Sequence, residues 1–355
     1  MRDFFNYSYP ELVGILEEDF GASAYRATQL FEWVYRKGVT DFGQMTNISQ
    51  KLRDQFAEAF YFPSAKIHER HISSDGSRKY LFEVEEGDLV ESVMIKQVNR
   101  MTLCVSSQVG CAMGCTFCRT GTMGLKRSLS TSEILRQVNG VIEDAKEFGD
   151  SFQNIVFMGM GEPLHNYDGV TRAVSNLTNS FGYGMSPRKV TVSTVGLVPA
   201  IRKLAESDVS VSLAVSLNAT TDEIRSQVMP VNRKYPISEL LDAVRLFPDS
   251  PRKKVTIEYV MLGGVNDSDQ DMKRLAKMMR GLPVKINLIP YNDNAGLGYK
   301  TPEREWVFTW QRYLNSQGHQ AFIRWSKGAD IAAACGQLAT ASKKSKLPVV
   351  EQTAA

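Results

Sequence analysis

Residues 101–118 read MTLCVSSQVGCAMGCTFC, and they join a predicted strand to a loop that holds three cysteines. The apolar and β-branched residues at the start predict a strand over 101–106. In the loop that follows, Cys111, Cys115 and Cys118 are separated by three and two residues. Thiols this close together can converge on one metal centre, whereas three cysteines cannot all pair as disulfides. The segment therefore predicts a metal site directly after a strand.

Strands and helices alternate along the chain from residue 100 onward. The helix that follows Ser130 is the clearest, because Glu133 completes a capping box and an apolar stripe comes next. Strands separated by helices of this length imply parallel β/α units, with function at the carboxyl ends of the strands. We expect an α/β fold in which six units and a last strand form a partial (β/α)6 barrel of the TIM type. The predicted strands are 101–106, 155–159, 189–194, 211–217, 255–261, 284–289 and 321–325.

Two smaller parts precede this barrel. Residues 1–62 carry apolar stripes with helical spacing, which predicts a small helical module that binds RNA if the basic groups serve it. Residues 63–99 contain two turn signals between alternating apolar segments, which predicts an antiparallel meander added to the edge of the barrel. The barrel then occupies 100–340, and the tail 341–355, rich in Ala, Ser, Lys and Thr, is expected to be disordered.

Composition is that of an ordinary globular enzyme, with 355 residues, 43% hydrophobic and 23% charged. There is no apolar run of about 18 residues and no signal-peptide pattern, so we expect a cytoplasmic protein without membrane contact. The net charge of +3 is too small to indicate nucleic-acid binding by itself. The basic residues are grouped, however, and such groups can neutralise phosphates if they share a face. The groups are Lys126-Arg127, Arg188-Lys189, Arg233-Lys234, Arg252-Lys253-Lys254 and Lys343-Lys344.

The three clustered cysteines leave two kinds of metal site open. Structural zinc usually needs a fourth ligand nearby, and the nearest histidines, His71 and His165, lack the spacing of a zinc finger. Three thiolates suit a [4Fe-4S] cluster with one iron open, because a closed cluster takes four protein ligands. An odd total of five cysteines also argues against a secreted disulfide framework.

Polar residues stand at the ends of several predicted strands. Gly161 and Glu162 follow the second strand, and glycine permits close approach of a ligand while the carboxylate can accept hydrogen bonds from an ammonium group. Each of the other residues is, by itself, as typical of a turn or helix cap. Together they predict a polar rim around the mouth of the barrel. They are Ser193, Ser216, Leu217, Asn218 and Asn292.

The cysteine spacing after a first strand resembles that of the radical S-adenosylmethionine (SAM) superfamily. This resemblance implies that Cys111, Cys115 and Cys118 hold a [4Fe-4S] cluster whose open iron binds SAM. It also implies that the polar rim binds SAM, through Gly161, Glu162, Ser193, Ser216, Leu217, Asn218 and Asn292. Asn218 stands where many related proteins carry histidine.

Three further features narrow the resemblance to the RlmN family, over nearly the whole chain to about residue 340. Cys104 precedes the cluster motif by seven residues, Cys335 lies in the segment KGADIAAACGQL (327–338), and Glu91 lies in the meander. The family methylates carbon 2 of adenine 2503 in 23S rRNA and of adenine 37 in tRNAs. The resemblance thus implies both RNAs as partners, a flavodoxin-type or equivalent electron donor, and a monomer.

The resemblance also implies roles for these three residues, with two SAM molecules per turnover. Cys335 is methylated first and becomes the S-methylcysteine intermediate. A radical then forms on that methyl group and adds to the adenine ring, which tethers the RNA to the protein. Glu91 is the proton acceptor. Cys104 is the resolving thiol that forms a transient disulfide with Cys335 and releases the base.

Two alternatives remain from the sequence. The first is a Cfr-like methylase, which uses similar cysteines but modifies carbon 8 of the same adenine, and spacing alone does not report regiochemistry. The second is a non-enzymatic Fe–S or zinc protein that binds RNA through its basic groups. The first alternative differs from the main hypothesis in the position of the methyl group. The second differs in that the protein would not cleave SAM.

Overall fold

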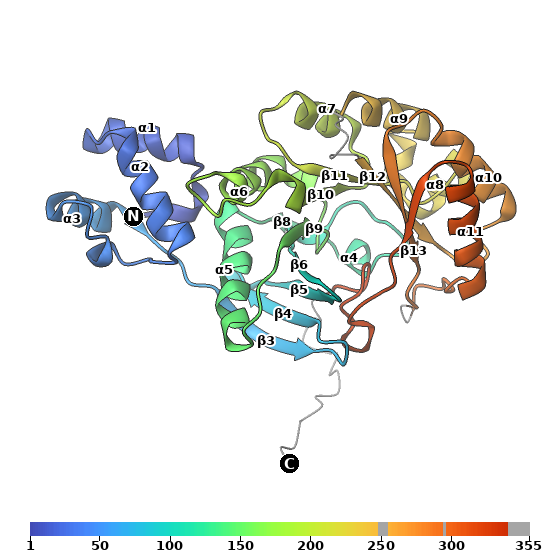
Figure 1. Ribbon diagram of the computed structural model, residues 1–355, viewed down its shortest axis with the longest axis horizontal. Helices are drawn as coiled ribbons and strands as arrows, with labels where there is room; N and C mark the ends of the chain where they lie inside the picture. Colours follow the sequence, from blue (N-terminus) through green and yellow to red (C-terminus); the bar gives the residue numbers. More distant parts are fainter. Residues whose placement is uncertain (248–254, 294–295, 340–355) are drawn as a thin grey trace, which may run out of the picture.

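The frame of the molecule is one ten-stranded sheet, seen in a computed structural model that describes residues 1–247, 255–293 and 296–339. The strands follow the order β14-β13-β12-β11-β10-β9-β6-β5-β4-β3 (Figure 1). From β6 to β14 every neighbouring pair is parallel. This confirms the predicted partial barrel, with β3 and β14 at its two open ends. The parallel strands are β6 (Arg100–Cys104), β9 (Asn154–Phe157), β10 (Val190–Thr194), β11 (Ser212–Ser216), β12 (Val255–Met261), β13 (Val284–Pro290) and β14 (Gln320–Ile323).

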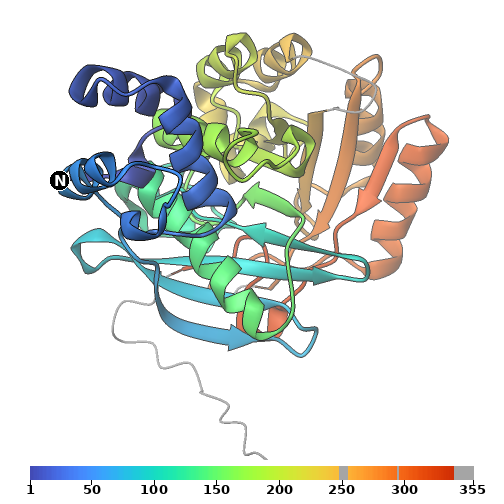
Figure 2. The same ribbon diagram turned by 60° about the vertical axis from the view of Figure 1, so that its left-hand side comes forward.

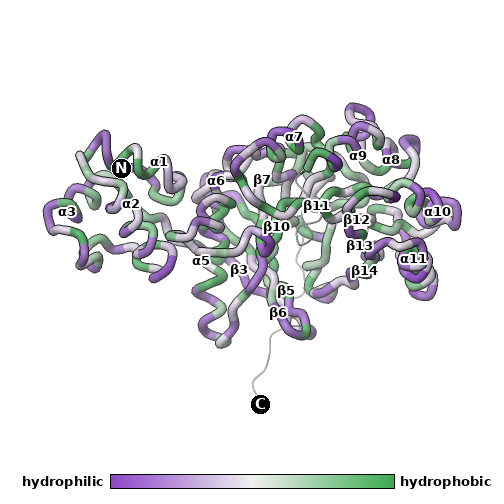
Figure 3. Tube along the Cα trace, turned by 45° about the horizontal axis from the view of Figure 1, so that its top comes forward, coloured by the Kyte–Doolittle hydropathy of each residue, from purple (hydrophilic) through white to green (hydrophobic). Residues whose placement is uncertain are grey.

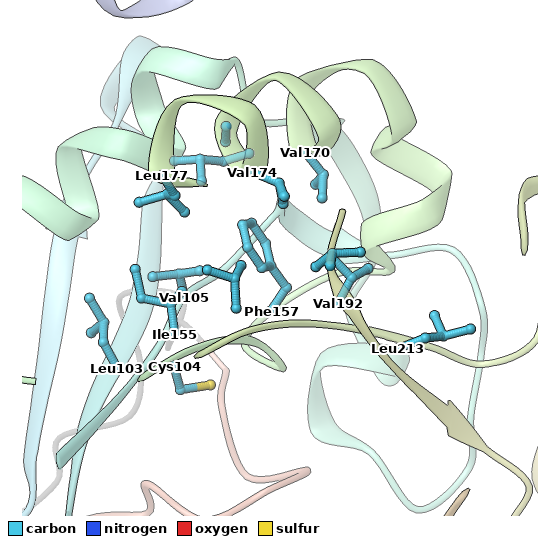
Figure 4. Packing of buried hydrophobic residues seen from close by; sticks show 14 of the residues in the cluster. Leu103, Cys104, Val105, Ile155, Phe157, Val170, Val174, Leu177, Val192 and Leu213 are labelled. Carbon is cyan, nitrogen blue, oxygen red and sulfur yellow. The ribbon is translucent and has the colours of Figure 1, made fainter. Parts of the chain in front are cut away.

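Helices connect these strands and cover the outer face of the sheet. The helix after Ser130 begins with the predicted capping box, in which Ser130 and Glu133 satisfy each other's backbone N–H groups. Figure 4 shows how the layers meet: Phe157 and Ile155 of β9 pack against Val174 and Leu177 of a helix. The connecting helices are α5 (Thr131–Glu147), α6 (Tyr167–Thr178), α7 (Val198–Glu206), α8 (Asp222–Val228), α9 (Ile237–Leu246), α10 (Asp269–Met278) and α11 (Arg304–Ser316).

The predicted meander forms as β3 (Lys66–Ile72), β4 (Arg78–Glu83) and β5 (Leu89–Gln97). All three are antiparallel to their neighbours, and β5 pairs with the first barrel strand in a register that sets Val93 opposite Cys104. Because side chains alternate along a strand, Glu91, Val93 and Cys104 share one face of the sheet. In Figure 4 the Cys104 side chain points away from the helix-covered face on which Leu103 lies. The shared face is therefore the inside of the barrel.

A small hairpin around the cysteine loop is absent from the prediction. It consists of β7 (Gln108–Cys111) and β8 (Gly124–Ser128), with the short helix α4 (Arg119–Thr122) between them. Gly110 has a φ of 77° and lies so close to Gly124 that a Cβ atom would overlap the Gly124 carbonyl oxygen. Only glycine fits there, and its neighbour Cys111 is thereby fixed at the end of a strand.

The N-terminal helices pack against α5 and α6 of the barrel. Figure 2 shows the blue helices lying against the green helices of the barrel. Asn6 accepts a hydrogen bond from the Ser132 N–H group (3.0 Å), and Glu11 forms an ion pair with Arg172 (2.8 Å). The elements are β1 (Arg2–Asp3), α1 (Tyr9–Phe20), α2 (Ala24–Phe31), α3 (Gln50–Ala59) and β2 (Phe60–Tyr61).

Hydrophilic and hydrophobic residues are distributed differently between the outer helices and the inner elements. Figure 3 shows hydrophilic residues along α10 and α11 and hydrophobic residues concentrated on the inner elements. Within the described residues, no helix combines the length and the apolar character needed to span a bilayer. The predicted tail at 341–355 lies outside the described residues. The short helical turns of the chain are η1 (Phe4–Asn6), η2 (Glu32–Arg36, a π-helix), η3 (Phe42–Gln44), η4 (Glu85–Gly87), η5 (Pro163–Asn166), η6 (Pro187–Lys189), η7 (Pro230–Arg233) and η8 (Ala329–Ile331).

Candidate active site at the mouth of the barrel

A cavity opens at the carboxyl ends of the parallel strands, where the β/α architecture predicts function. Its empty volume is about 880 Å³, including the open mouth. Two cysteines of the loop after β7, Cys115 and Cys118, form one wall, and Cys335 forms another. The strand ends contribute Phe157, Ser193, Ser216 and Pro290, and Glu258 lines the cavity from the middle of β12.

The cysteine loop is held in place by apolar packing. Phe117 and Cys115 belong to a small hydrophobic cluster with Met229, Leu262 and Tyr291. The Thr116 N–H group also donates to the Val228 carbonyl oxygen at the end of α8 (3.0 Å). The loop is thus fixed between α8 and the end of β12, which holds its thiols against the cavity.

The three thiols form a donor set suited to an iron–sulfur cluster. Burial raises the pKa of Cys111 to about 12 and also raises those of Cys115 and Cys118, while backbone N–H groups point at the sulfurs of Cys111 and Cys118. Buried thiolates need a cationic partner, and N–H groups directed at sulfur are typical of cluster sites. Within the described ranges, no three His, Cys, Asp or Glu side chains are grouped closely enough to hold a single metal ion. A four-iron cube binds its thiolates at separate corners, so its ligands need not meet at one point.

The loop after β9 presents a buried carboxylate to the cavity. Glu162 accepts hydrogen bonds from the N–H groups of Val195 (2.8 Å) and Leu164 (3.0 Å). Burial raises its pKa to about 7, although these hydrogen bonds oppose the shift. Gly161, with a φ of 101°, lets the loop approach Gln108 so closely that a side chain would clash. A buried carboxylate of this kind gains most from a ligand that carries an ammonium group.

The other predicted SAM-binding residues divide into two groups. Ser193, Ser216, Asn218 and Asn292 line the same cavity as Gly161 and Glu162. Leu217 does not line it, because its side chain is fully buried in the main hydrophobic core. Its backbone holds neighbouring elements instead, since its N–H group donates to the Glu258 carbonyl oxygen (3.0 Å).

Asn218 has a left-handed backbone conformation, and its side chain is hydrogen-bonded within the protein. Its φ is 54°, a left-handed conformation that asparagine tolerates better than most residues. Its side-chain oxygen accepts a hydrogen bond from the Val260 N–H group (2.8 Å), and its carbonyl oxygen accepts one from Asn266 (2.7 Å). Asn218 therefore ties the end of β11 to β12 and to the segment after it, in addition to facing the cavity.

Cys335 enters the cavity on a loop that is anchored at several points. Arg119, next to the cysteine loop, donates its N–H to the Gly336 carbonyl oxygen (2.9 Å), and Thr120 donates its hydroxyl to the Leu338 carbonyl oxygen (2.6 Å). The Asp330 carboxylate accepts from the Ser73 hydroxyl in the β3–β4 turn (2.6 Å). Cys335 is an exposed residue whose side chain lines the cavity, and the protein atoms around its thiol raise its pKa to about 11.

Cys104 lies close enough to Cys335 for their charges to interact. It ends β6 with its side chain buried, and burial together with the Cys335 thiol raises its pKa well above the usual range. All five cysteines are free in this structure. Residues 104 and 335, which are far apart in sequence, are thus brought to one region beside the cavity.

Glu91 lies on the same inner face as Cys104. Its carboxylate forms an ion pair with Lys79 on β4 (3.1 Å) and accepts a hydrogen bond from the Ala339 N–H group (3.0 Å). Both charged side chains are almost fully buried. The C-terminal loop therefore docks directly on Glu91, four residues beyond Cys335.

Sequence reasoning missed two charged residues of this region, Glu258 and Lys79. Glu258 lines the cavity from within β12, where burial raises its pKa to about 7 and the Asn287 amide donates to it (2.8 Å). A carboxylate in the middle of a predicted apolar strand was the signal that could have found it. Lys79 gave no comparable signal, because lysine in a meander strand is usually solvated.

Of the basic groups noted in the sequence, Lys126-Arg127 pairs with carboxylates, whereas Arg188-Lys189 and Arg233-Lys234 are exposed. Lys126 forms an ion pair with Asp88 (2.6 Å), and Arg127 pairs with both Asp88 (3.1 Å) and Glu133 (2.9 Å). These cations brace the β7–β8 hairpin against the meander, so their charge is already balanced. The groups at 252–254 and 343–344 lie outside the described residues.

Two family models match the chain. The model described as the radical SAM superfamily matches residues 105–276. The model described as the ribosomal RNA large subunit methyltransferase N-terminal domain matches residues 3–61. The two matches fall on the barrel and on the N-terminal helices, respectively.

Similar proteins and a solved structure cover nearly the whole chain. It is 50% identical over 318 residues to the dual-specificity RNA methyltransferase RlmN of Geobacter sulfurreducens, spanning 90% of this chain and 87% of that protein. It is 46% identical over 350 residues to the protein of the same name from Pelobacter propionicus, spanning 99% and 98%. The crystal structure of a radical SAM methyltransferase from Sphaerobacter thermophilus aligns with a TM-score of 0.85 at 40% identity, covering 95% of this chain and 99% of that one.

Proposed function

The chain belongs to the RlmN family of radical SAM RNA methyltransferases, and from this premise we propose that it methylates carbon 2 of adenine in both 23S rRNA and tRNA. The target positions we propose are adenine 2503 of 23S rRNA and adenine 37 of tRNAs. The observation that carries this proposal is the single cavity into which Cys115, Cys118, Glu162 and Cys335 all open. A non-enzymatic RNA-binding protein is set aside, since the family consists of enzymes.

Members of this superfamily use a [4Fe-4S] cluster and SAM, and when bound these supply a methyl group and a radical able to remove hydrogen from an unactivated carbon. The residues that would hold the cluster are Cys111, Cys115 and Cys118. Glu162 would hold the SAM ammonium group, because its buried carboxylate faces the cavity and already has its backbone donors. The strand-end residues Ser193, Ser216, Asn218 and Asn292 would orient the remainder of SAM.

Cys335 would carry the methyl carbon to the RNA. Its surface is open to the cavity, while the loop on both sides of it is fastened to the cysteine loop and to the β3–β4 turn. A thiol so placed can accept a methyl group on one side and meet an RNA base entering through the mouth on the other. We propose that S-methylated Cys335 is the intermediate whose carbon becomes bonded to the adenine ring.

Glu91 and Cys104 would complete the reaction. Glu91, ionised beside Lys79, would accept the proton that the adenine carbon loses. Cys104, as a thiolate, would attack the Cys335 sulfur, so that the sulfur–carbon bond breaks and the methylated base leaves. The pair would then be a disulfide, which needs reduction before the next turnover. We also propose a flavodoxin-type or equivalent electron donor and a monomeric enzyme.

Recognition of the RNA would use shape and a displaced base. The target base must leave its stack to reach a thiol inside the cavity, as it does in other enzymes that modify bases. The N-terminal helices extend from the barrel on the side of α5 and α6 and offer a second surface for folded RNA (Figure 1).

Nucleoside analysis tests this function directly. Protein reconstituted anaerobically with iron and sulfide is incubated with SAM, a reductant, and either unmodified tRNA or a 23S rRNA fragment. We expect 2-methyladenosine from both RNAs, measured by mass spectrometry after digestion. Cys335→Ala is the control, which we expect to cleave SAM but to form no methylated RNA. Formation of 8-methyladenosine, or methylated RNA from Cys335→Ala, would contradict the proposal.

A further inference from the structure

Glu91 forms a buried ion pair with Lys79, a residue to which the mechanism above assigns no role of its own. Lys79 Nζ is 3.1 Å from Glu91 Oε1, and the two side chains are only 6% and 7% exposed. Such pairs contribute little net stability, because removing both charges from water costs about as much as their attraction returns. A buried lysine beside a proposed proton acceptor therefore calls for a functional explanation.

We propose that Lys79 is a positioning residue, whose ammonium group keeps the Glu91 carboxylate ionised and fixes its orientation toward the Cys335 loop. The inference rests on the proposed function, which makes Glu91 the proton acceptor. Lys79 holds one carboxylate oxygen, and the Ala339 N–H group holds the other at 3.0 Å. The carboxylate is thus clamped between the meander and the loop that carries Cys335.

Strand register explains why Lys79 reaches Glu91. Lys79 on β4 is paired with Val93 on β5, and Val93 is paired with Cys104 on β6. Cross-strand partners share a face, and Glu91 is two residues from Val93 on the same strand. Lys79, Glu91 and Cys104 therefore all project to the inner face. A shift of one residue in this register would turn Lys79 to the opposite face.

Opposing effects act on the ionisation of Glu91. Burial raises its pKa above the ordinary value, and this is the largest effect. Lys79, the Ala339 N–H group and, from β3, His71 lower it. His71 is partly exposed and pairs with Glu69 at 3.1 Å, whereas Lys79 is buried and in direct contact. Lys79 is therefore the main group that opposes the effect of burial.

Lys79 sets the pH at which Glu91 can accept a proton. A proton acceptor works only when it is deprotonated, so activity is present above its pKa and is lost as the pH falls through it. Removing Lys79 leaves burial less opposed, and the pKa of Glu91 rises. The acidic limb of the pH–rate profile should then move to higher pH, by about one to three pH units for an opposite charge at this distance.

The experiment measures single-turnover formation of 2-methyladenosine against pH, with the reconstituted full-length enzyme and tRNA. We expect Lys79→Met to shift the acidic limb upward and Lys79→Arg to restore it largely. Below the shifted limb, Lys79→Met should accumulate RNA attached to protein, detected on denaturing gels. Lys66→Met is the matched control, because Lys66 on β3 forms an ion pair with Glu83 on β4 (2.5 Å), in the same meander, but is exposed. Its profile should not move.

A second neutral variant is tested in case Lys79→Met does not fold. Lys79→Gln keeps a hydrogen-bond donor beside Glu91 but removes the charge, and it should show the same shift as Lys79→Met. If the neutral variants lose activity equally at every pH and the limb stays in place, Lys79 is only structural and the inference is wrong. Glu91→Gln distinguishes failure of the proposed function from failure of the inference about Lys79. Appreciable activity in that variant overturns the proposed role of Glu91 itself, whatever the Lys79 variants show.

Discussion

The cysteine loop and the C-terminal loop bring thiols to the same cavity in contrasting ways. On the first, here called the cluster side, Cys111, Cys115 and Cys118 lie within eight residues and are fixed by a local hairpin and a small apolar cluster. On the second, here called the relay side, Cys335, Cys104 and Glu91 come from three distant segments. The cysteines of the cluster side are neighbours in the chain and their loop is held by α8 and the end of β12, whereas the residues of the relay side meet only when the meander, the barrel and the C-terminal loop are packed together.

This difference implies separable functions. The residues proposed to bind SAM, Glu162 and the strand-end serines, line the cavity together with Cys115 and Cys118 of the cluster side. The relay side adds the residues proposed to deliver carbon to RNA. Substitutions on the cluster side should abolish both SAM cleavage and RNA methylation. Substitutions on the relay side should abolish RNA methylation and leave SAM cleavage intact.

Cys115→Ala should have the largest effect, because it removes a buried sulfur from the cluster side. We expect loss of bound iron after reconstitution, together with loss of 5′-deoxyadenosine and of methylated RNA. Iron content, the visible absorption spectrum and product analysis measure these effects. A variant that retained the full iron content and activity would show that Cys115 is not a ligand.

Cys104→Ala should abolish release of product while sparing the cluster side. Iron content and SAM cleavage should match the wild type, and the RNA should remain attached to Cys335 because no thiol resolves the adduct. Denaturing gels and mass spectrometry of the attached peptide measure this outcome. Normal turnover by this variant would remove Cys104 from the mechanism and leave the relay side with one thiol.

Glu162→Gln should weaken SAM binding without removing the cluster. A charge-assisted hydrogen bond in a buried site contributes about 1.5–3 kcal/mol, so we expect roughly a 10- to 100-fold rise in the SAM dissociation constant at pH 8. In the wild type, affinity should fall as the pH drops below about 7, where Glu162 becomes protonated. Calorimetric titration of the reconstituted protein across pH checks both points, and a pH-independent wild-type affinity would contradict them.

Glu258→Gln should alter the pH dependence of stability. Burial raises the pKa of Glu258 to about 7 from its ordinary value of about 4.5. Its protonated form is therefore favoured in the folded state, and this stabilisation, about 3 kcal/mol, is present below pH 4.5 and lost as the pH rises to 7. Denaturant unfolding at pH 5 and pH 8 should show a smaller difference in the variant than in the wild type.

Asp330→Asn should have the smallest effect, because it loosens the relay side without changing its chemistry. The carboxylate accepts hydrogen bonds from the Ser73 hydroxyl (2.6 Å) and the Ser74 N–H group (2.9 Å) near the surface. We expect a decrease of a few-fold in methylated RNA and no change in SAM cleavage, because exposed polar contacts are individually weak. An equal decrease in both products would mean that the two sides are not separable.

The sequence by itself determined the local features of this protein. Hydrophobic periodicity predicted the six β/α units and the meander, and the capping box at Ser130 predicted the start of α5. The spacing of Cys111, Cys115 and Cys118 indicated the cluster side, because those ligands are neighbours in the chain. Each of these features depends on residues a few positions apart, which a linear pattern reports faithfully.

Only the tertiary structure decided which distant residues meet. Strand register brought Lys79 to Glu91 and to the face of Cys104, and docking of the C-terminal loop brought Cys335 to the same region. Packing also turned the Leu217 side chain into the core and paired Lys126 and Arg127 with carboxylates, and the sequence reported neither arrangement. The physical reason is that side-chain direction and ion pairing depend on long-range packing, and no short pattern in the sequence records which segments will lie side by side.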